Sequence, residues 1–152
     1  MNYQQQAIAS MNPVELIVAL YDGMTQFLYR AIAAIEDHSP RDRRIAVGRV
    51  LAILMHLQSR LKMDVGGNSA RALSEFYASI FALCLEGSRL DSADRLREAI
   101  GCIRDVRDAW NTAAHEPEVL ELLQGGGAAA PAMMSARSAA QISDSAEARW
   151  TA

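Results

Sequence analysis

Residues 12–35 read NPVELIVALYDGMTQFLYRAIAAI, and this stretch predicts a long amphipathic helix. Asn12 can cap the helix, Pro13 suits its first position, and Glu15 can return a hydrogen bond to the cap. Apolar residues then recur at helical spacing in one stripe: Ile17, Leu20, Tyr21, Met24, Leu28, Ala31 and Ile35. Because such a stripe seats a helix in a bundle, the stretch favours an all-α fold.

The same helix carries more apolar residues than one stripe requires. One flank of the stripe holds Val14, Val18, Tyr29 and Ile32, and the other holds Leu16, Phe27 and Ala34. The polar residues form only a narrow strip, made of Glu15, Asp22, Gln26 and Arg30. A helix of this kind is either nearly surrounded by its own protein or offers a face to a partner. Both interpretations stay open for the flanks.

The composition is that of a globular protein, with 152 residues, 51% of them hydrophobic and 22% charged. This length suits one domain. The net charge of −3 disfavours nucleic acid and anionic membranes as partners. The one basic cluster, Arg41, Arg43, Arg44 and Arg49, is interpreted as a solvated helix face. No signal peptide is recognised, and no apolar run approaches the ~20 residues of a membrane span, so membrane insertion is not expected.

Three further helices follow from caps and periodicity. Ser39, Pro40 and Asp42 repeat the capping pattern, and a second helix should run from Pro40 to about Met63, ended by Gly66 and Gly67. Its inner apolar stripe consists of Val47, Val50, Leu54, Leu57 and Leu61.

A third helix, capped by Asn68, should run over residues 69–86, and Gly87 and Ser88 should break it. Its inner stripe is Leu73, Tyr77, Ile80 and Cys84, widened by Phe76, Phe81 and Leu85. Asp91 is expected to cap a fourth helix that reaches about Ala114, with the stripe Leu96, Ala99, Ile103, Val106 and Trp110. Cys84 and Cys102 lack CxxC spacing and are expected to be buried thiols.

These elements predict an antiparallel up-down four-helix bundle over residues 12–115. Residues 1–11 are expected to form a mobile N-terminal arm, Pro117 can open a short fifth helix over residues 116–124, and residues 125–152 are expected to form a disordered low-complexity tail. Gly23, Gly48 and Gly101 fall inside helices, where close approach of a neighbouring helix would explain them.

Catalytic signatures do not emerge from the sequence, so an enzyme, a metal site and a cofactor are not expected. His38 and His115 fall at predicted helix ends. His56 lies within the second helix, but the lysine-glycine pair that follows the histidine of phosphotransfer domains is missing. No Glu-x-x-His pair, phosphate-binding GxxxxGKS loop or GxSxG motif occurs.

The remaining hypothesis is a binding surface. A groove between two apolar helices takes an amphipathic helix or an extended peptide. The candidate partner-binding residues are Leu16 and Phe27 on the first helix, Phe76 and Phe81 on the third, and Tyr3 and Ile8 in the arm. For the four helix residues, core packing remains the competing interpretation.

Several motifs, in order and at matching spacing over about residues 3–113, resemble the FliS-type flagellar export chaperones. Tyr3 and Pro13 precede Val14-Glu15-Leu16, then Leu20-Tyr21-Asp22-Gly23, Phe27-Leu28 and Ala31. Gly66-Gly67, Leu73 with Phe76-Tyr77, and Arg107-Asp108-Ala109-Trp110 complete the resemblance. Asn12, Lys62, Ala72 and Gly87-Ser88 depart from the family's pattern.

This resemblance implies a non-enzymatic cytoplasmic chaperone. Such a protein would bind the disordered C-terminal segment of flagellin, block premature polymerisation and aid flagellin secretion for filament assembly. Export-apparatus components or flagellar regulators are further implied partners. The arm, through Tyr3 and Ile8, would cover part of the binding surface when flagellin is absent.

Two alternatives remain. A bacterial four-helix adaptor or regulatory module would use a similar groove for another amphipathic helix, without preference for flagellin. A histidine phosphotransfer domain would carry acid-labile phosphate on His56.

Overall fold

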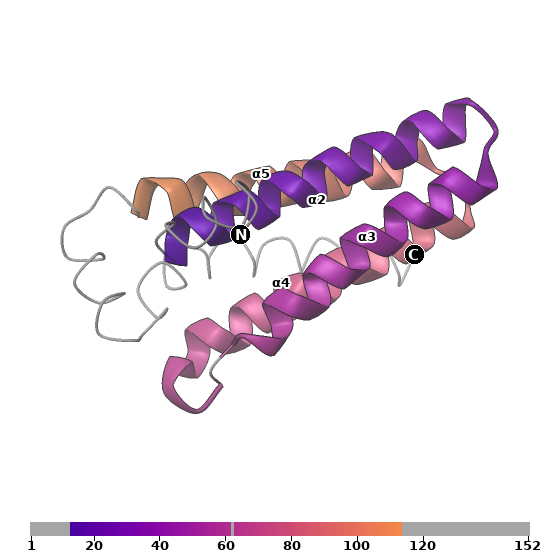
Figure 1. Ribbon diagram of the computed structural model, residues 1–152. Coiled ribbons are helices and arrows are strands. Elements are labelled where there is room, and N and C mark those ends of the chain that lie inside the picture. Colours follow the sequence, from indigo (N-terminus) through magenta and orange to yellow (C-terminus); the bar gives the residue numbers. More distant parts are fainter. Residues whose placement is uncertain (1–12, 62, 114–152) are drawn as a thin grey trace, which may run out of the picture.

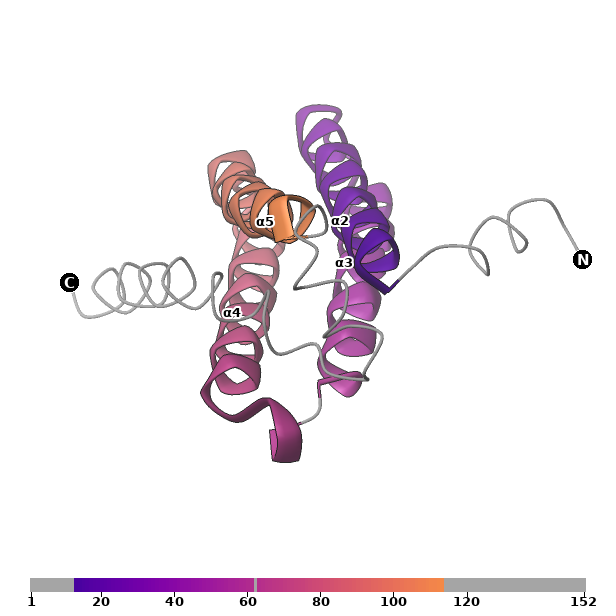
Figure 2. The same ribbon diagram turned by 90° about the vertical axis from the view of Figure 1, so that its left-hand side faces the viewer.

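Four antiparallel helices make up the described part of the chain (Figure 1). The computed structural model describes residues 13–61 and 63–113, and the description of side chains excludes residues 63–66. The helices are α2 (Pro13–Glu36), α3 (Pro40–Ser59), α4 (Met63–Arg89) and α5 (Ala93–Ala113). Each packs chiefly against two neighbours, so that α2, α3, α4 and α5 follow one another around the bundle (Figure 2). The predicted all-α antiparallel bundle is thereby confirmed.

The arm, the Asn12 cap, the fifth helix and the tail lie outside the described residues. Tyr3, Ile8 and His115 lie there too. Within the described helices, none combines the length and the apolar character that crossing a membrane requires.

The turn between α2 and α3 closes one helix and opens the next. The Ser39 amide donates to the Ala34 carbonyl at 2.8 Å and the His38 amide to the Ile35 carbonyl at 3.1 Å, while His38 takes a φ of 54°. This is the Schellman pattern, with a histidine in the left-handed position that glycine usually fills. Ser39 then accepts a hydrogen bond from the Asp42 amide at 3.4 Å, and Pro40 occupies the first position of α3. The predicted cap of α3 is therefore confirmed.

The end of α3 and the start of α4 differ from expectation. α3 ends at Ser59, about one turn before the predicted end at Met63. There the Ser59 hydroxyl donates to the His56 carbonyl at 2.7 Å, and the Arg60 amide turns back to the Leu57 carbonyl at 3.2 Å. A serine side chain that competes with the backbone in this way ends a helix locally, before the glycine pair is reached. Gly67, with φ 53° and ψ −132°, interrupts the helical path inside α4, so the uninterrupted part of α4 begins beside the predicted start at residue 69, after a short helical stretch over residues 63–66.

The predicted break at Gly87 and the predicted cap at Asp91 were both wrong. α4 continues through Gly87 to Arg89, and Asp91 forms the left-handed end of that helix with a φ of 49°. Ser92 caps α5 instead, because its hydroxyl accepts from the Arg95 amide at 3.3 Å. Asp91 pairs with Arg43 of α3, which ties the two turns at this end of the bundle together.

The glycines inside the helices have different neighbours from those expected. A Cβ at Gly48 or Gly101 would meet nothing within 4 Å, so close approach does not explain either residue. At Gly23 a Cβ would lie 3.7 Å from the Ile53 Cδ1, an ordinary contact. Gly87 is the close approach, because a Cβ there would lie 2.7 Å from the Leu96 Cδ2. α4 and α5 therefore meet tightly where the sequence suggested a helix break.

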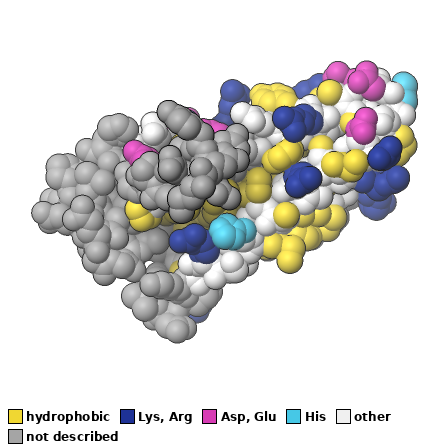
Figure 3. All heavy atoms as spheres, in the orientation of Figure 1, with side chains coloured by type: hydrophobic (Ala, Val, Ile, Leu, Met, Phe, Trp, Pro, Cys, Tyr) yellow, Lys and Arg dark blue, Asp and Glu magenta, His cyan; other side chains and the backbone are white. Residues whose placement is uncertain are grey.

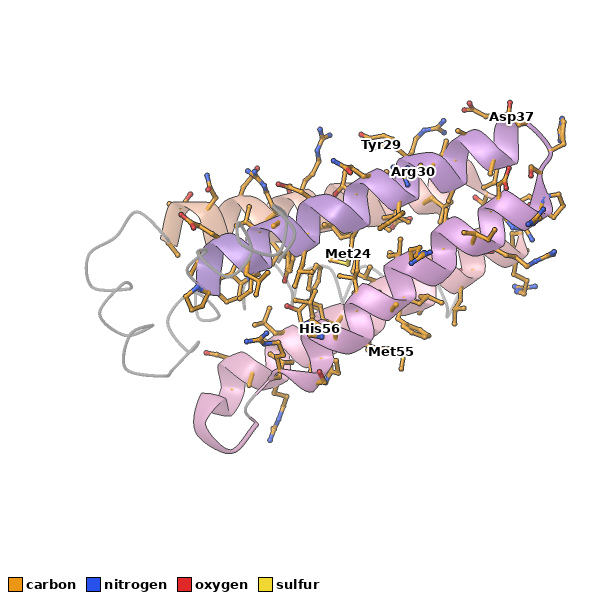
Figure 4. The ribbon with its side chains drawn as sticks, in the orientation of Figure 1. Met24, Tyr29, Arg30, Asp37, Met55 and His56 are labelled. Carbon is orange, nitrogen blue, oxygen red and sulfur yellow. The ribbon has the colours of Figure 1, made fainter. Side chains whose placement is uncertain are left out.

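One core runs along the bundle, and all four helices contribute to it. Its largest fully buried side chains include Tyr21, Met24 and Leu28 from α2, and Trp110 from α5. In Figure 4, Met24 points into the bundle, whereas Tyr29 and Arg30 point away from it. Cys84 is fully buried, but Cys102 is only half-buried, which corrects the expectation that both thiols would be enclosed.

Candidate functional site: two apolar seams beside α3

The structure divides the four predicted surface residues of the helices into two groups. Leu16 and Phe27 on α2 and Phe81 on α4 are half-buried, so part of each side chain reaches the surface. Phe76 is 0% exposed and packs against the Tyr77 ring with centroids 5.7 Å apart. Phe76 is therefore a core residue here, and its assignment to the binding surface is corrected.

The burial of Phe76 follows from the position of α4 between two neighbours. The predicted inner stripe centred on Tyr77 and Cys84, but Leu83, which is also buried, lies two helical turns beyond Phe76 on the same side. Since α4 packs against both α3 and α5, its buried face is wider than one stripe. Phe81 lies at the α3 edge of that face and keeps partial exposure.

The first apolar surface, here named the α2/α3 seam, consists of Leu16, Leu20 and Phe27 of α2 with Ile53 of α3. The three α2 residues share one side of the helix with Gly23, and the Ile53 Cδ1 would lie 3.7 Å from a Cβ built at that glycine. All four are half-buried. The Arg30 guanidinium lies 5.2 Å from the centroid of the Phe27 ring and covers part of it. The seam therefore presents apolar side chains at the surface, with a cation beside them.

The second surface, the α3/α4 seam, consists of Leu51 of α3 with Phe81 and Leu85 of α4. A hydrogen bond from the Gln58 Nε2 to the Ser74 Oγ, 2.7 Å long, sets the register of the two helices at one end. With antiparallel helices in this register, Leu51 lies opposite Phe81. Leu85 is 47% exposed, while Leu51 and Phe81 are half-buried against the core. The two seams therefore lie on either side of α3.

A buried polar network joins three helices beneath these surfaces. The Tyr21 and Tyr77 hydroxyls are 2.7 Å apart, and the Trp110 indole N–H donates to the Tyr21 oxygen at 3.3 Å. Burial raises the pKa of Tyr77 to about 12 and raises the pKa of Tyr21 well above 10. Both phenols therefore stay neutral and hydrogen-bonded, and the network fixes α2, α4 and α5 relative to one another.

An ion pair at the surface joins α2 to α5 next to this network. The Arg107 Nε donates to the Asp22 Oδ1 at 3.1 Å and a second guanidinium nitrogen to the Asp22 Oδ2 at 3.4 Å. These hydrogen bonds raise the pKa of Arg107. The LYDG and RDAW motifs thus meet in space, since Tyr21 and Asp22 of the first contact Trp110 and Arg107 of the second. Both motifs act in the packing of the bundle.

A shallow hollow opens beside the same pair of helices. Its volume is about 230 Å³, and it is lined by Val14, Glu15, Val18, Ala19, Asp22 and Asn111. It lies across α2 and α5, away from the two seams. Among the described residues no group of three His, Cys, Asp or Glu side chains is placed to hold a metal ion. His56 is exposed on α3 (Figure 4).

Two of the most exposed apolar side chains are not among the predicted surface residues. Met55 is 64% exposed and Ile45 is 50% exposed, both on α3. They do not belong to the inner apolar stripe of that helix. Their spacing of ten residues was a signal for a second stripe that faces outward. Figure 3 looks onto this side of the molecule and shows hydrophobic side chains gathered along α3.

Comparison with known proteins gives a consistent match. The family model for the flagellar protein FliS matches residues 1–117. The flagellar secretion chaperone FliS of Campylobacter jejuni is 31% identical over 108 residues, covering 71% of this chain and 84% of that protein. FliSB of Pseudomonas aeruginosa is 26% identical, with 74% and 93% covered, and FliS of Salmonella typhimurium is 27% identical, with 70% and 79% covered. On its bundle, its motifs and these matches, the chain belongs to the FliS family of flagellar secretion chaperones.

Proposed function

We propose that this chain binds the disordered C-terminal segment of flagellin in the cytosol, blocks its premature polymerisation and aids its secretion for filament assembly. The observation that carries the proposal is the pair of apolar seams beside α3. Leu16 and Phe27 belong to one seam and Phe81 belongs to the other, and each keeps part of its side chain at the surface. Family membership supports the role of a secretion chaperone.

Seams of this kind suit a cargo that is unfolded before it binds. An amphipathic segment can lay its apolar side chains along the seams and gain hydrogen-bonded helical structure as it does so. Part of the contact energy is spent on ordering the segment, so the affinity stays moderate for the area buried. A holder that must later release its cargo benefits from this balance.

The N-terminal arm has a place in the same proposal. Through Tyr3 and Ile8 it would cover part of the apolar surface when cargo is absent, which lowers the apparent affinity by the fraction of molecules held closed. Deleting residues 2–9 should change flagellin affinity only modestly and make the purified protein more prone to self-association. If the deletion alters neither surface-dye binding nor self-association, the arm does not cover the surface.

The direct test is a calorimetric titration with the flagellin C-terminal segment from the same cell. Leu16→Glu and Leu85→Glu place a charge in each seam and should each weaken binding about tenfold or more, because the bound carboxylate would lose its water. Ala33→Glu, at an exposed position of α2 outside both seams, is the matched control and should leave the affinity within about twofold. No binding by the folded wild-type protein, or equal binding by all four proteins, would refute the proposal.

A further inference from the structure

The side of α3 that faces away from the core carries a second periodic pattern. Residues spaced alternately four and three apart form an outer stripe: Arg41, Ile45, Gly48, Ala52, Met55 and Ser59. All six are exposed. The inner face of the same helix buries Val47, Val50, Leu54 and Leu57 instead. α3 is therefore apolar on two opposite faces, and only one of them has a partner within the described bundle.

The shape of the outer stripe suits another helix. Alternating steps of four and three residues are the spacing at which one helix packs along a second. The centre of the stripe is small, since a Cβ at Gly48 would meet nothing within 4 Å and Ala52 adds only a methyl group. Ile45 and Met55 stand on either side of that centre, ten residues and ~15 Å apart along the helix. A helix of about four turns could rest on Gly48 and Ala52 and contact both large side chains.

The charges around the stripe are mainly positive and are not neutralised within the bundle. Arg41, Arg44, Arg49 and Arg60 are exposed, and none forms an ion pair among the residues that the structure describes. On α5, by contrast, three of the four arginines, Arg95, Arg97 and Arg107, are each paired with a carboxylate. Figure 3 shows the basic side chains beside the hydrophobic ones over α3. A chain with a net charge of −3 thus presents one face that attracts acidic groups.

We propose that the outer stripe of α3 is a docking site for an amphipathic helix with Asp and Glu on its flanks, supplied by a protein other than the flagellin cargo. The apolar side of that helix packs on Ile45, Gly48, Ala52 and Met55. Its carboxylates pair with Arg41, Arg44, Arg49 and Arg60. This contact does not depend on flagellin binding, so the chaperone can hold a second protein while its seams are free or filled.

A second copy of this chain is the less suitable occupant. Ile45 and Met55 are symmetric about position 50, so an antiparallel pairing of two α3 helices about that point would bring the two Arg49 side chains together. Like charges at the centre of an interface oppose association. An acidic partner meets the same arginines with opposite charge.

The test uses two synthetic helices of about 18 residues with the same Leu/Ala stripe, one with Glu flanks and one with Lys flanks. Their binding to the full-length protein is measured by fluorescence anisotropy at low and at high salt. We expect saturable binding of the Glu-flanked helix that weakens as salt rises, and binding of the Lys-flanked helix that is at least about tenfold weaker. Equal binding of the two helices, or no binding of either, would overturn the proposal.

Ala52→Glu places a carboxylate in the centre of the stripe and should weaken binding of the Glu-flanked helix about tenfold or more. Ala33→Glu, an exposed alanine on α2, makes the same chemical change elsewhere and should leave binding within about twofold. Far-UV circular dichroism and urea unfolding of both variants establish that each is folded. If the two variants bind the helix equally, the outer stripe is not the docking site.

The flagellin C-terminal segment is titrated into the same two variants. If Ala52→Glu keeps its affinity for flagellin but no longer binds the Glu-flanked helix, the docking site is separate from the surface that binds the cargo. Loss of both would assign the stripe to the cargo surface and overturn the proposal of a second partner. Concentration-dependent dimerisation that Ala52→Glu abolishes, without binding of either synthetic helix, would make the stripe a self-interface and overturn it too. Failure of flagellin binding alone would refute only the proposed function.

Discussion

Replacing Tyr21 by phenylalanine tests how the buried polar network holds the bundle together. The Tyr21 hydroxyl lies between two partners, 2.7 Å from the Tyr77 hydroxyl and 3.3 Å from the Trp110 indole nitrogen. All three side chains are almost fully buried. Tyr21→Phe therefore leaves two buried groups, the Tyr77 hydroxyl and the Trp110 N–H, without their partner.

The magnitude follows from the number of groups left without a partner. A buried polar group that loses its hydrogen bond costs about 1–3 kcal/mol. Tyr21→Phe leaves two groups without a hydrogen-bond partner and should lower the free energy of unfolding by about 2–4 kcal/mol. Tyr77→Phe leaves only the Tyr21 O–H without a partner, because Trp110 keeps its acceptor. It should lower the free energy of unfolding by about 1–2 kcal/mol. The Tyr21→Phe/Tyr77→Phe double variant leaves only the Trp110 N–H without a partner. Its loss in free energy of unfolding should therefore be well below the sum of the losses in the two single variants.

The assay is urea unfolding of the full-length chain followed by far-UV circular dichroism. The expected order of stability is wild type, then Tyr77→Phe, then Tyr21→Phe. Tyr29→Phe is the matched control, since Tyr29 is 48% exposed on the same helix and its hydroxyl should contribute less than about 0.5 kcal/mol. If Tyr21→Phe is no less stable than Tyr77→Phe, or if the two costs simply add, the central position of Tyr21 in the network is refuted.

Three further predictions concern stability. His38→Gly should raise the free energy of unfolding by roughly 0.5–1 kcal/mol, because glycine adopts the φ of 54° without strain; a lower urea midpoint would contradict this. Gly87→Ala should cost about 1–2 kcal/mol because its Cβ meets Leu96, whereas Gly101→Ala, in open space, should stabilise by up to about 1 kcal/mol; equal thermal midpoints would count against the tight contact of α4 with α5. The folded-state pKa of Tyr77, about 12, exceeds its ordinary value of 10, so the free energy of unfolding should be highest below pH 10 and fall as the pH rises toward 12. Urea unfolding over this pH range measures the change, and a free energy of unfolding that rises instead would contradict the raised pKa of Tyr77.

Local sequence chemistry determined which segments are helical. Ser39, Pro40 and Asp42 predicted the start of α3, and the structure confirms it. The apolar stripes of all four helices predicted the bundle, since amphipathic periodicity requires neighbouring residues only. The motifs Leu20-Tyr21-Asp22-Gly23 and Arg107-Asp108-Ala109-Trp110 indicated the family, which the comparisons then established.

The tertiary structure decided which flank of each helix is covered. Periodicity gives the direction of a helix's apolar face but not the positions of its neighbours around that face. Phe76 is therefore buried while Phe81, at the edge next to α3, keeps part of its surface. Gly87 reads as a helix break in sequence, and only the proximity of Leu96 shows it to be a contact. The partners of Tyr21 and Asp22 lie 56 to 89 residues away in the chain, so only packing could bring the motif residues together.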